Sequence, residues 1–152
     1  MYDINKVAET ISAVRRELEQ QSGRKLNEVC IAAAGRVLRT VETRADIVLE
    51  SETVIDAEQI HSLEMLGVEQ AYQVIREETR NEGMQYFCVA YTVIRYYLND
   101  YAIVNLEDHK ATKISADIIV TFLPEEVIDS LYVAVEKAGL VVANLTLEPI
   151  AA

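Results

Sequence analysis

Two histidines are the residues in this sequence best suited to hold a metal or to act as a base. His61 stands three positions before Glu64, and on a helix this spacing places two metal ligands on one face. No cysteine or second histidine is near them in the sequence, so a solvated helix face is the better interpretation. His109 follows Glu107 and Asp108 in a charged segment, where a surface position again explains the three residues. We therefore predict no metal site.

Catalytic and phosphate-binding motifs are missing as well. The sequence contains no GxGxxG, GxxxxGK[ST], GxSxG or HExxH pattern, and its five glycines leave little material for a phosphate-binding loop. Glu125, Glu126 and Asp129 form an acidic group, but they fall in the first turn of an expected helix, where the helix dipole favours acids. We predict no catalytic residue and no cofactor-binding residue, so the chain is not expected to be an enzyme by itself.

Composition and charge restrict the class of protein further. The 152 residues are 51% hydrophobic and carry a net charge of −11, which disfavours direct binding to nucleic acid or to an anionic membrane surface. No apolar run is long enough to cross a bilayer, and residues 1–6 show no signal-peptide core. Cys30 and Cys88 each lie in an apolar run, so we predict two buried free thiols. A soluble cytoplasmic protein is expected.

The hydrophobic pattern predicts nine elements in the order α-β-β-α-β-β-β-α-β. Helical spacing is found over residues 3–21, from Asp56 to about residue 76, and from Pro124 to Gly139. Strands are expected at residues 29–33, 37–50, 86–98, 102–106, 114–122 and 140–147. The first helix is expected to pack on a sheet, and Gly67 could kink or split the second. The fold class is therefore α+β, a mixed β-sheet covered by helices.

Tyrosines gather in one of these strands. Five of the eight lie between residues 86 and 101, namely Tyr86, Tyr91, Tyr96, Tyr97 and Tyr101. Strict alternation along a strand would place Tyr91 and Tyr97 on one face and Tyr86 and Tyr96 on the other. Both faces cannot be core, and tyrosine is enriched at protein interfaces. The cluster either fills the core or forms a partner surface.

Several motifs resemble the bacterial FtsA family, which comprises actin-like cell-division ATPases. In that family a helix ending in A-G-L leads through a strand into L-E-P-L-A. The corresponding residues here are Ala138-Gly139-Leu140 and Leu147-Glu148-Pro149-Ile150-Ala151. Residues 31–38 are similar to V-G-I-S-G-x-H-I, residues 93–100 to V-I-P-x-x-Y-x-x-D, and residues 113–117 to R-L-E-A-D. The sequence departs from the family at Val37, Arg95 and residues 108–111, where the family has a histidine, a proline and G-M-x-G.

The resemblance implies a division into domains. Residues 35–112 match a strand-helix-strand-strand insert, subdomain 1C, and residues 1–34 and 113–152 match parts of subdomain 1A, an actin-like (ribonuclease H-like) subdomain. The family binds ATP and Mg²⁺ through loops that flank this region. We therefore expect the chain to be a fragment of a longer ATPase and to bind neither by itself. The parent protein is expected at the inner face of the cell membrane.

By resemblance, the insert contacts neighbouring subunits and other cell-division proteins, so self-assembly and recruitment are the expected functions. The candidate interface residues are Tyr91, Arg95, Tyr97, Asp100, Arg39 and Arg44. Three alternatives stay open. The chain could be a small-molecule-binding strand-helix-strand-strand domain, the equivalent module of an actin-like pilus-assembly protein, or a nucleotide-hydrolysing unit in its own right.

Overall fold

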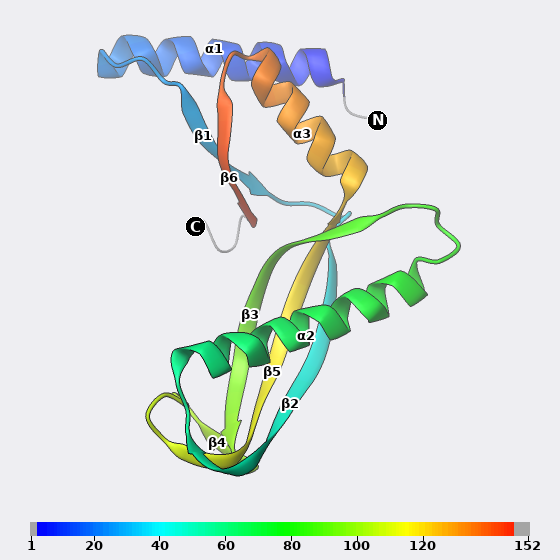
Figure 1. The fold of residues 1–152 in the computed structure, drawn as a ribbon. Coiled ribbons are helices and arrows are strands. Elements are labelled where there is room, and N and C mark those ends of the chain that lie inside the picture. The colour runs from blue at the N-terminus through cyan, green and yellow to red at the C-terminus, as the bar shows by residue number, and fades with distance from the viewer. Residues whose placement is uncertain (1–2, 148–152) are drawn as a thin grey trace. The chain divides into compact units, whose positions relative to one another are not determined.

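The computed structural model describes residues 3–147, and the chain divides into two compact units. One unit comprises the N-terminal segment up to Val37 together with the C-terminal segment from Leu123, and the other runs from Leu38 to Phe122. Figure 1 shows the nine elements in chain order. Within residues 3–147, no helix is long and apolar enough to cross a membrane.

The first unit contains two helices and a two-stranded parallel sheet (Figure 1). Its elements are α1 (Ile4–Ser22), β1 (Glu28–Ala33), α3 (Glu125–Lys137) and β6 (Val141–Leu147). The paired strands run in register from Glu28↔Val141 to Ala33↔Leu147, with one shift after Val29. The helix α3 packs on β6, whereas α1 packs chiefly on α3. The expectation that the first helix packs on a sheet is therefore wrong.

Helix α1 has clear local signals at both ends. The Asp3 carboxylate accepts hydrogen bonds from the backbone N–H groups of Asn5 and Lys6, and Gly23 ends the helix with a φ of 66°. Arg15 joins α1 to the end of α3, because its Nη1 donates to the carbonyl oxygen of Ala138 at 2.9 Å. A cation at a helix C-terminus is electrostatically favourable.

The second unit is a four-stranded sheet with one helix on one face (Figure 1). Its elements are β2 (Arg39–Val54), α2 (Ala57–Glu78), β3 (Tyr86–Leu98), β4 (Tyr101–Ile103) and β5 (Lys110–Pro124), and the strand order is β2-β5-β3-β4. Strands β2 and β5 pair antiparallel from Arg39↔Phe122 to Val48↔Lys113, with a register shift beyond Val48. The core lies between this sheet and α2, where Leu63 and Ile118 are fully buried.

Gly67 allows α2 to lie close to the sheet. The helix is continuous through this residue, so the expected split is wrong. A Cβ atom at position 67 would lie 2.5 Å from Cδ1 of Ile118, which is too close for any side chain at the present spacing. The Gly67 carbonyl oxygen also accepts a hydrogen bond from Oγ1 of Thr43 at 2.9 Å. A side chain at position 67 would therefore have to displace the terminal methyl group of Ile118 or move the helix away from the sheet.

The predicted order of elements is confirmed, and so is the α+β fold class. Some details differ. The structure groups residues 113–122 with the second unit, because β5 pairs along β2, whereas the family resemblance assigned them to the flanking segments. Pro124 is the N-cap residue of α3 and not its first helical residue. Cys30 is exposed and Cys88 is half-buried, so the prediction that both thiols are buried is wrong.

Candidate functional site

Strand β3 does not alternate strictly, and this decides which tyrosines share a face. The β3 residues packed on the core are Tyr86, Cys88, Tyr91, Val93, Tyr96 and Leu98. Successive members of this series are two positions apart, except from Cys88 to Tyr91 and from Val93 to Tyr96, where they are three apart. Regular alternation is therefore interrupted at these two points, so the strand changes its facing at each of them. The predicted arrangement is therefore wrong. Tyr91 and Tyr96 lie on the same face, towards α2, while Tyr97 lies on the opposite face.

Tyr91 and Tyr96 share one carboxylate from α2. The Tyr91 hydroxyl donates to Oε2 of Glu64 at 2.8 Å, and the Tyr96 hydroxyl donates to Oε1 at 2.5 Å. Burial, then the hydrogen bond to Glu64 and then its charge raise the pKa of Tyr91 to about 12 and raise that of Tyr96 further. These contacts fasten β3 to α2. The structure therefore places Tyr91 in the packing of the sheet against its helix.

The sheet face opposite α2 has a polar centre formed by Arg44, Tyr97 and Asp117, which we call the open-face cluster. The guanidinium carbon of Arg44 lies 4.2 Å from the centroid of the Tyr97 ring, a stacked cation–π geometry. The Tyr97 hydroxyl donates to Oδ2 of Asp117 at 2.6 Å, and Nη1 of Arg44 lies 3.5 Å from Oδ1 of the same carboxylate. Three strands thus each contribute one residue.

The polar network extends from this cluster towards the β3–β4 turn. Oγ of Ser115 donates to Oδ1 of Asp46 at 2.5 Å, and Nε of Arg44 lies 3.6 Å from the same oxygen. Nζ of Lys113 lies 2.9 Å from Oδ1 of Asp100 in the turn. Roughly a third to two-fifths of the Arg44, Asp46, Lys113 and Asp117 side chains is exposed, so the network is open to a partner while its rotamers are already fixed.

Arg39 lies in a separate group at the start of β2. Its Nη2 is 2.8 Å from Oε1 of Glu82, and its guanidinium carbon is 5.7 Å from the centroid of the Tyr86 ring. The Tyr86 hydroxyl donates to the other oxygen of Glu82 at 3.1 Å. Burial, followed by the hydrogen bond to Glu82, raises the pKa of Tyr86. Arg39 therefore binds the segment that precedes β3.

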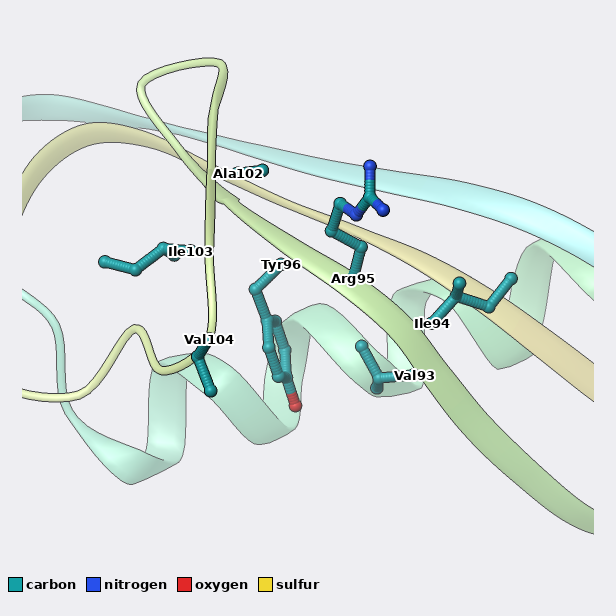
Figure 2. A pocket seen from close by; sticks show the side chains of 7 residues that line it. All are labelled: Val93, Ile94, Arg95, Tyr96, Ala102, Ile103 and Val104. Carbon is teal, nitrogen blue, oxygen red and sulfur yellow. The ribbon is translucent and has the colours of Figure 1, made fainter.

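Arg95 lies beside a surface groove where β4 ends. The groove has a volume of about 440 Å³. It is lined by Val93, Ile94, Arg95, Tyr96, Ala102, Ile103 and Val104. Figure 2 shows the Arg95 and Tyr96 side chains pointing to opposite sides of β3. Arg95 is exposed and belongs to none of the ion pairs formed among residues 3–147.

The six candidate interface residues thus fall into different places. Arg44 and Tyr97 are in contact, and Asp100 joins their network through Lys113. Arg95 lies at the groove, and Arg39 pairs with Glu82 in a separate group. Tyr91 packs on α2. Sequence reasoning missed Asp117 and Asp46 as members of the site. The available signal was the alternation of polar and apolar residues along β2 and β5. When two such strands pair, the polar residues on the shared face become neighbours.

Two observations concern metal and ligand chemistry. Residues 3–147 contain no group of three or more His, Cys, Asp and Glu side chains arranged to hold a metal ion. Among the same residues, every buried side-chain nitrogen or oxygen has a hydrogen-bond partner. A second hollow of about 410 Å³ lies between the end of α2 and the start of β3.

Comparison with known proteins supports the fold. No protein-family model matches the sequence, and no curated protein matches it. Among solved structures, the chain is similar to a chain of the PilM-PilN type IV pilus biogenesis complex, with a TM-score of 0.50 and 14% identity. The similarity covers 97% of this chain and 35% of that one, so this chain spans about a third of the solved chain's length. At this identity the likeness supports the fold alone, and it does not single out the FtsA family.

Proposed function

We propose that this chain is a protein-docking part of a larger actin-like assembly protein, and that it mediates self-association and the recruitment of partner proteins. The observation that carries the proposal is the open-face cluster. Arg44 stacks on Tyr97, and Asp117 fixes both side chains while all three stay partly exposed. Tyrosine and arginine are the side chains that most often dominate binding energy at protein interfaces, and fixed rotamers lower the entropy cost of binding.

Two kinds of parent protein are compatible with this function. The sequence motifs at residues 135–151 and 113–117 favour an FtsA-type cell-division protein. The solved structure, which belongs to a pilus biogenesis complex, favours a pilus-assembly protein instead. In either case we propose that the partners are a second copy of the parent and other proteins of the same assembly, in the cytoplasm. No contact with nucleic acid or with the membrane is proposed for this chain.

We assign no enzymatic role to the chain, and neither ATP nor Mg²⁺ is assigned to any of its residues. The net charge of −11 opposes a bound nucleotide unless a dedicated site overcomes it, and the described residues offer neither a metal-binding cluster nor an unpartnered buried polar group. Isothermal titration calorimetry with Mg²⁺ and ATP checks this directly. Binding in the micromolar range would contradict the assignment.

Site-specific photo-crosslinking in the source cell tests the docking function. A photo-reactive amino acid replaces Glu42, which is exposed on β2 two residues before Arg44, in the full parent protein, and a matched control replaces Glu69, which is exposed on α2. We expect products with the parent itself and with one partner class at position 42 and not at position 69. Cell-division partners would identify the FtsA-type parent, and pilus proteins the other. Equal yields at both positions would contradict the proposal.

A further inference from the structure

One edge of the second unit's sheet lacks a strand neighbour. Strand β3 lies between β5 and β4, but β4 pairs only with its last three residues, from Tyr96↔Ile103 to Leu98↔Tyr101. The backbone N–H of Cys88 donates a hydrogen bond to the hydroxyl oxygen of Tyr72 at 2.8 Å. Between these two points, residues 89–95 have no strand on the β4 side within the described part of the chain.

This edge carries few of the residues that usually protect a strand against pairing. Natural proteins protect such edges with lysine, proline or very short strands, because the free N–H and C=O groups can pair with another chain. Residues 89–95 read Val-Ala-Tyr-Thr-Val-Ile-Arg and contain neither lysine nor proline. Valine, isoleucine, tyrosine and threonine all favour strands. The edge is therefore suited to accept one more strand.

The groove beside Arg95 lies on the path that an added strand would follow. It begins where β4 stops, so a segment placed there would continue the line of β4 along β3 (Figure 2). Ile94 is 52% exposed and Val104 is 94% exposed, so both offer apolar surface that an incoming side chain would cover. At 3.3 Å per residue, about seven extended residues would span positions 89–95.

We propose that this edge binds an extended segment of another protein as an added β-strand. The segment is apolar at alternate positions and carries a carboxylate that contacts Arg95. The inference rests on the proposed docking function and adds a second surface to it. A guanidinium binds carboxylates with paired hydrogen bonds, and Arg95 has no ion-pair partner among residues 3–147.

Charge favours a different protein over a second copy of this chain. A second copy carries −11, so it brings more negative charge to this edge than a short segment does. Charges more than about 8–10 Å away are screened at physiological salt, so the contact at the edge itself is decided by Arg95. A short acidic-apolar segment therefore satisfies the local charge without adding a second strongly acidic body.

A random peptide library tests this surface even though the partner protein is unidentified. A phage-displayed library of random nonapeptides is selected on the full chain, and the enriched peptide is synthesised with a fluorescent label for anisotropy measurements. We expect enriched peptides to alternate apolar residues with polar ones and to contain Asp or Glu. Arg95→Glu should raise Kd at least tenfold, and Arg95→Gln by a smaller factor. The matched control is Arg16→Glu, at an exposed position of α1, and it should leave the Kd of the peptide unchanged.

Two further measurements identify the mode of binding. N-methylation of alternate peptide residues removes backbone donors and keeps the side chains, so it should abolish binding by an added strand. Tyr97→Ala should leave peptide binding intact, so this surface and the open-face cluster can fail independently. Failure to enrich any peptide, or binding that survives both Arg95→Glu and N-methylation, would overturn the inference. A dimer of the chain alone that Arg95→Glu dissociates would also overturn it, because the occupant would then be a second copy.

Discussion

The Glu64 carboxylate provides the sharpest prediction about stability. It accepts hydrogen bonds from two tyrosine hydroxyls, Tyr91 and Tyr96, and both hydroxyls lose their acceptor in Glu64→Ala. A hydrogen bond to a charged group contributes about 1.5–3 kcal/mol, and partial exposure favours the lower end for each of these two. We expect Glu64→Ala to lower the free energy of unfolding by about 2–3 kcal/mol, most of it from the two lost acceptors.

A triple variant distinguishes the loss of hydrogen bonding from the loss of packing. Removing all three polar groups together, in Glu64→Leu with Tyr91→Phe and Tyr96→Phe, leaves no unsatisfied donor. This triple variant should lose less than about 1 kcal/mol, because replacing all partners by apolar groups can be nearly neutral. The single Tyr→Phe variants should each lose about 0.5–1.5 kcal/mol.

Urea unfolding followed by circular dichroism at the helical band measures these changes, since the chain contains no tryptophan. The control is Glu69→Ala, an exposed carboxylate on the same helix, which should change the unfolding free energy by no more than about 0.5 kcal/mol. If Glu64→Ala behaved like this control, the two hydroxyls would not depend on the carboxylate. A triple variant as unstable as Glu64→Ala would also refute the reasoning.

Three other predictions concern the same unit. Gly67→Ala should cost about 1–2 kcal/mol through contact with Ile118, less in an Ile118→Val background, and a net gain in urea unfolding would show that the helix can move away. Stability should fall as pH rises from about 10 to 12, because the raised pKa values of Tyr91 and Tyr96 keep protons on the native state that the unfolded chain has lost. Their double Phe variant should lose less stability over this range; an identical pH profile would argue against the assignment. Asp108→Gly should raise the melting temperature slightly, since φ is 66° there, and a fall of several degrees would contradict this.

Local patterns predicted most of the elements. The expected helix starts at residues 3 and 56, the helix end at residue 21 and the strand end at residue 98 agree with the structure to within about a residue. These boundaries coincide with the caps Asp3 and Asp56, the stop at Gly23 and the turn at residues 99–100, which are each determined by neighbouring residues. The strand at residues 86–98 was predicted with the bounds that β3 has. These features depend on interactions within a few residues, which a sequence displays directly.

Features that depend on distant residues were harder to predict. The two changes of facing in β3 reversed the predicted neighbours of Tyr91, because regular alternation was assumed for a strand that packs on a helix. The role of Gly67 in α2 depends on Ile118 in the distant strand β5, so a kink or a split was the local interpretation. Of the candidate site, the pairing of Arg44 with Tyr97 required the strand order β2-β5-β3, which periodicity does not specify.

The central claim is that the open-face cluster docks other proteins. Competition in the crosslinking experiment tests it most directly. Excess purified chain is added to an extract in which the parent protein carries the photo-reactive residue at position 42, and the yield of each crosslinked product is measured. The account predicts that unmodified chain suppresses the products at least tenfold more effectively than chain with Arg44→Glu, which breaks the stack on Tyr97 and the contact with Asp117. Equal suppression by the two chains would contradict it.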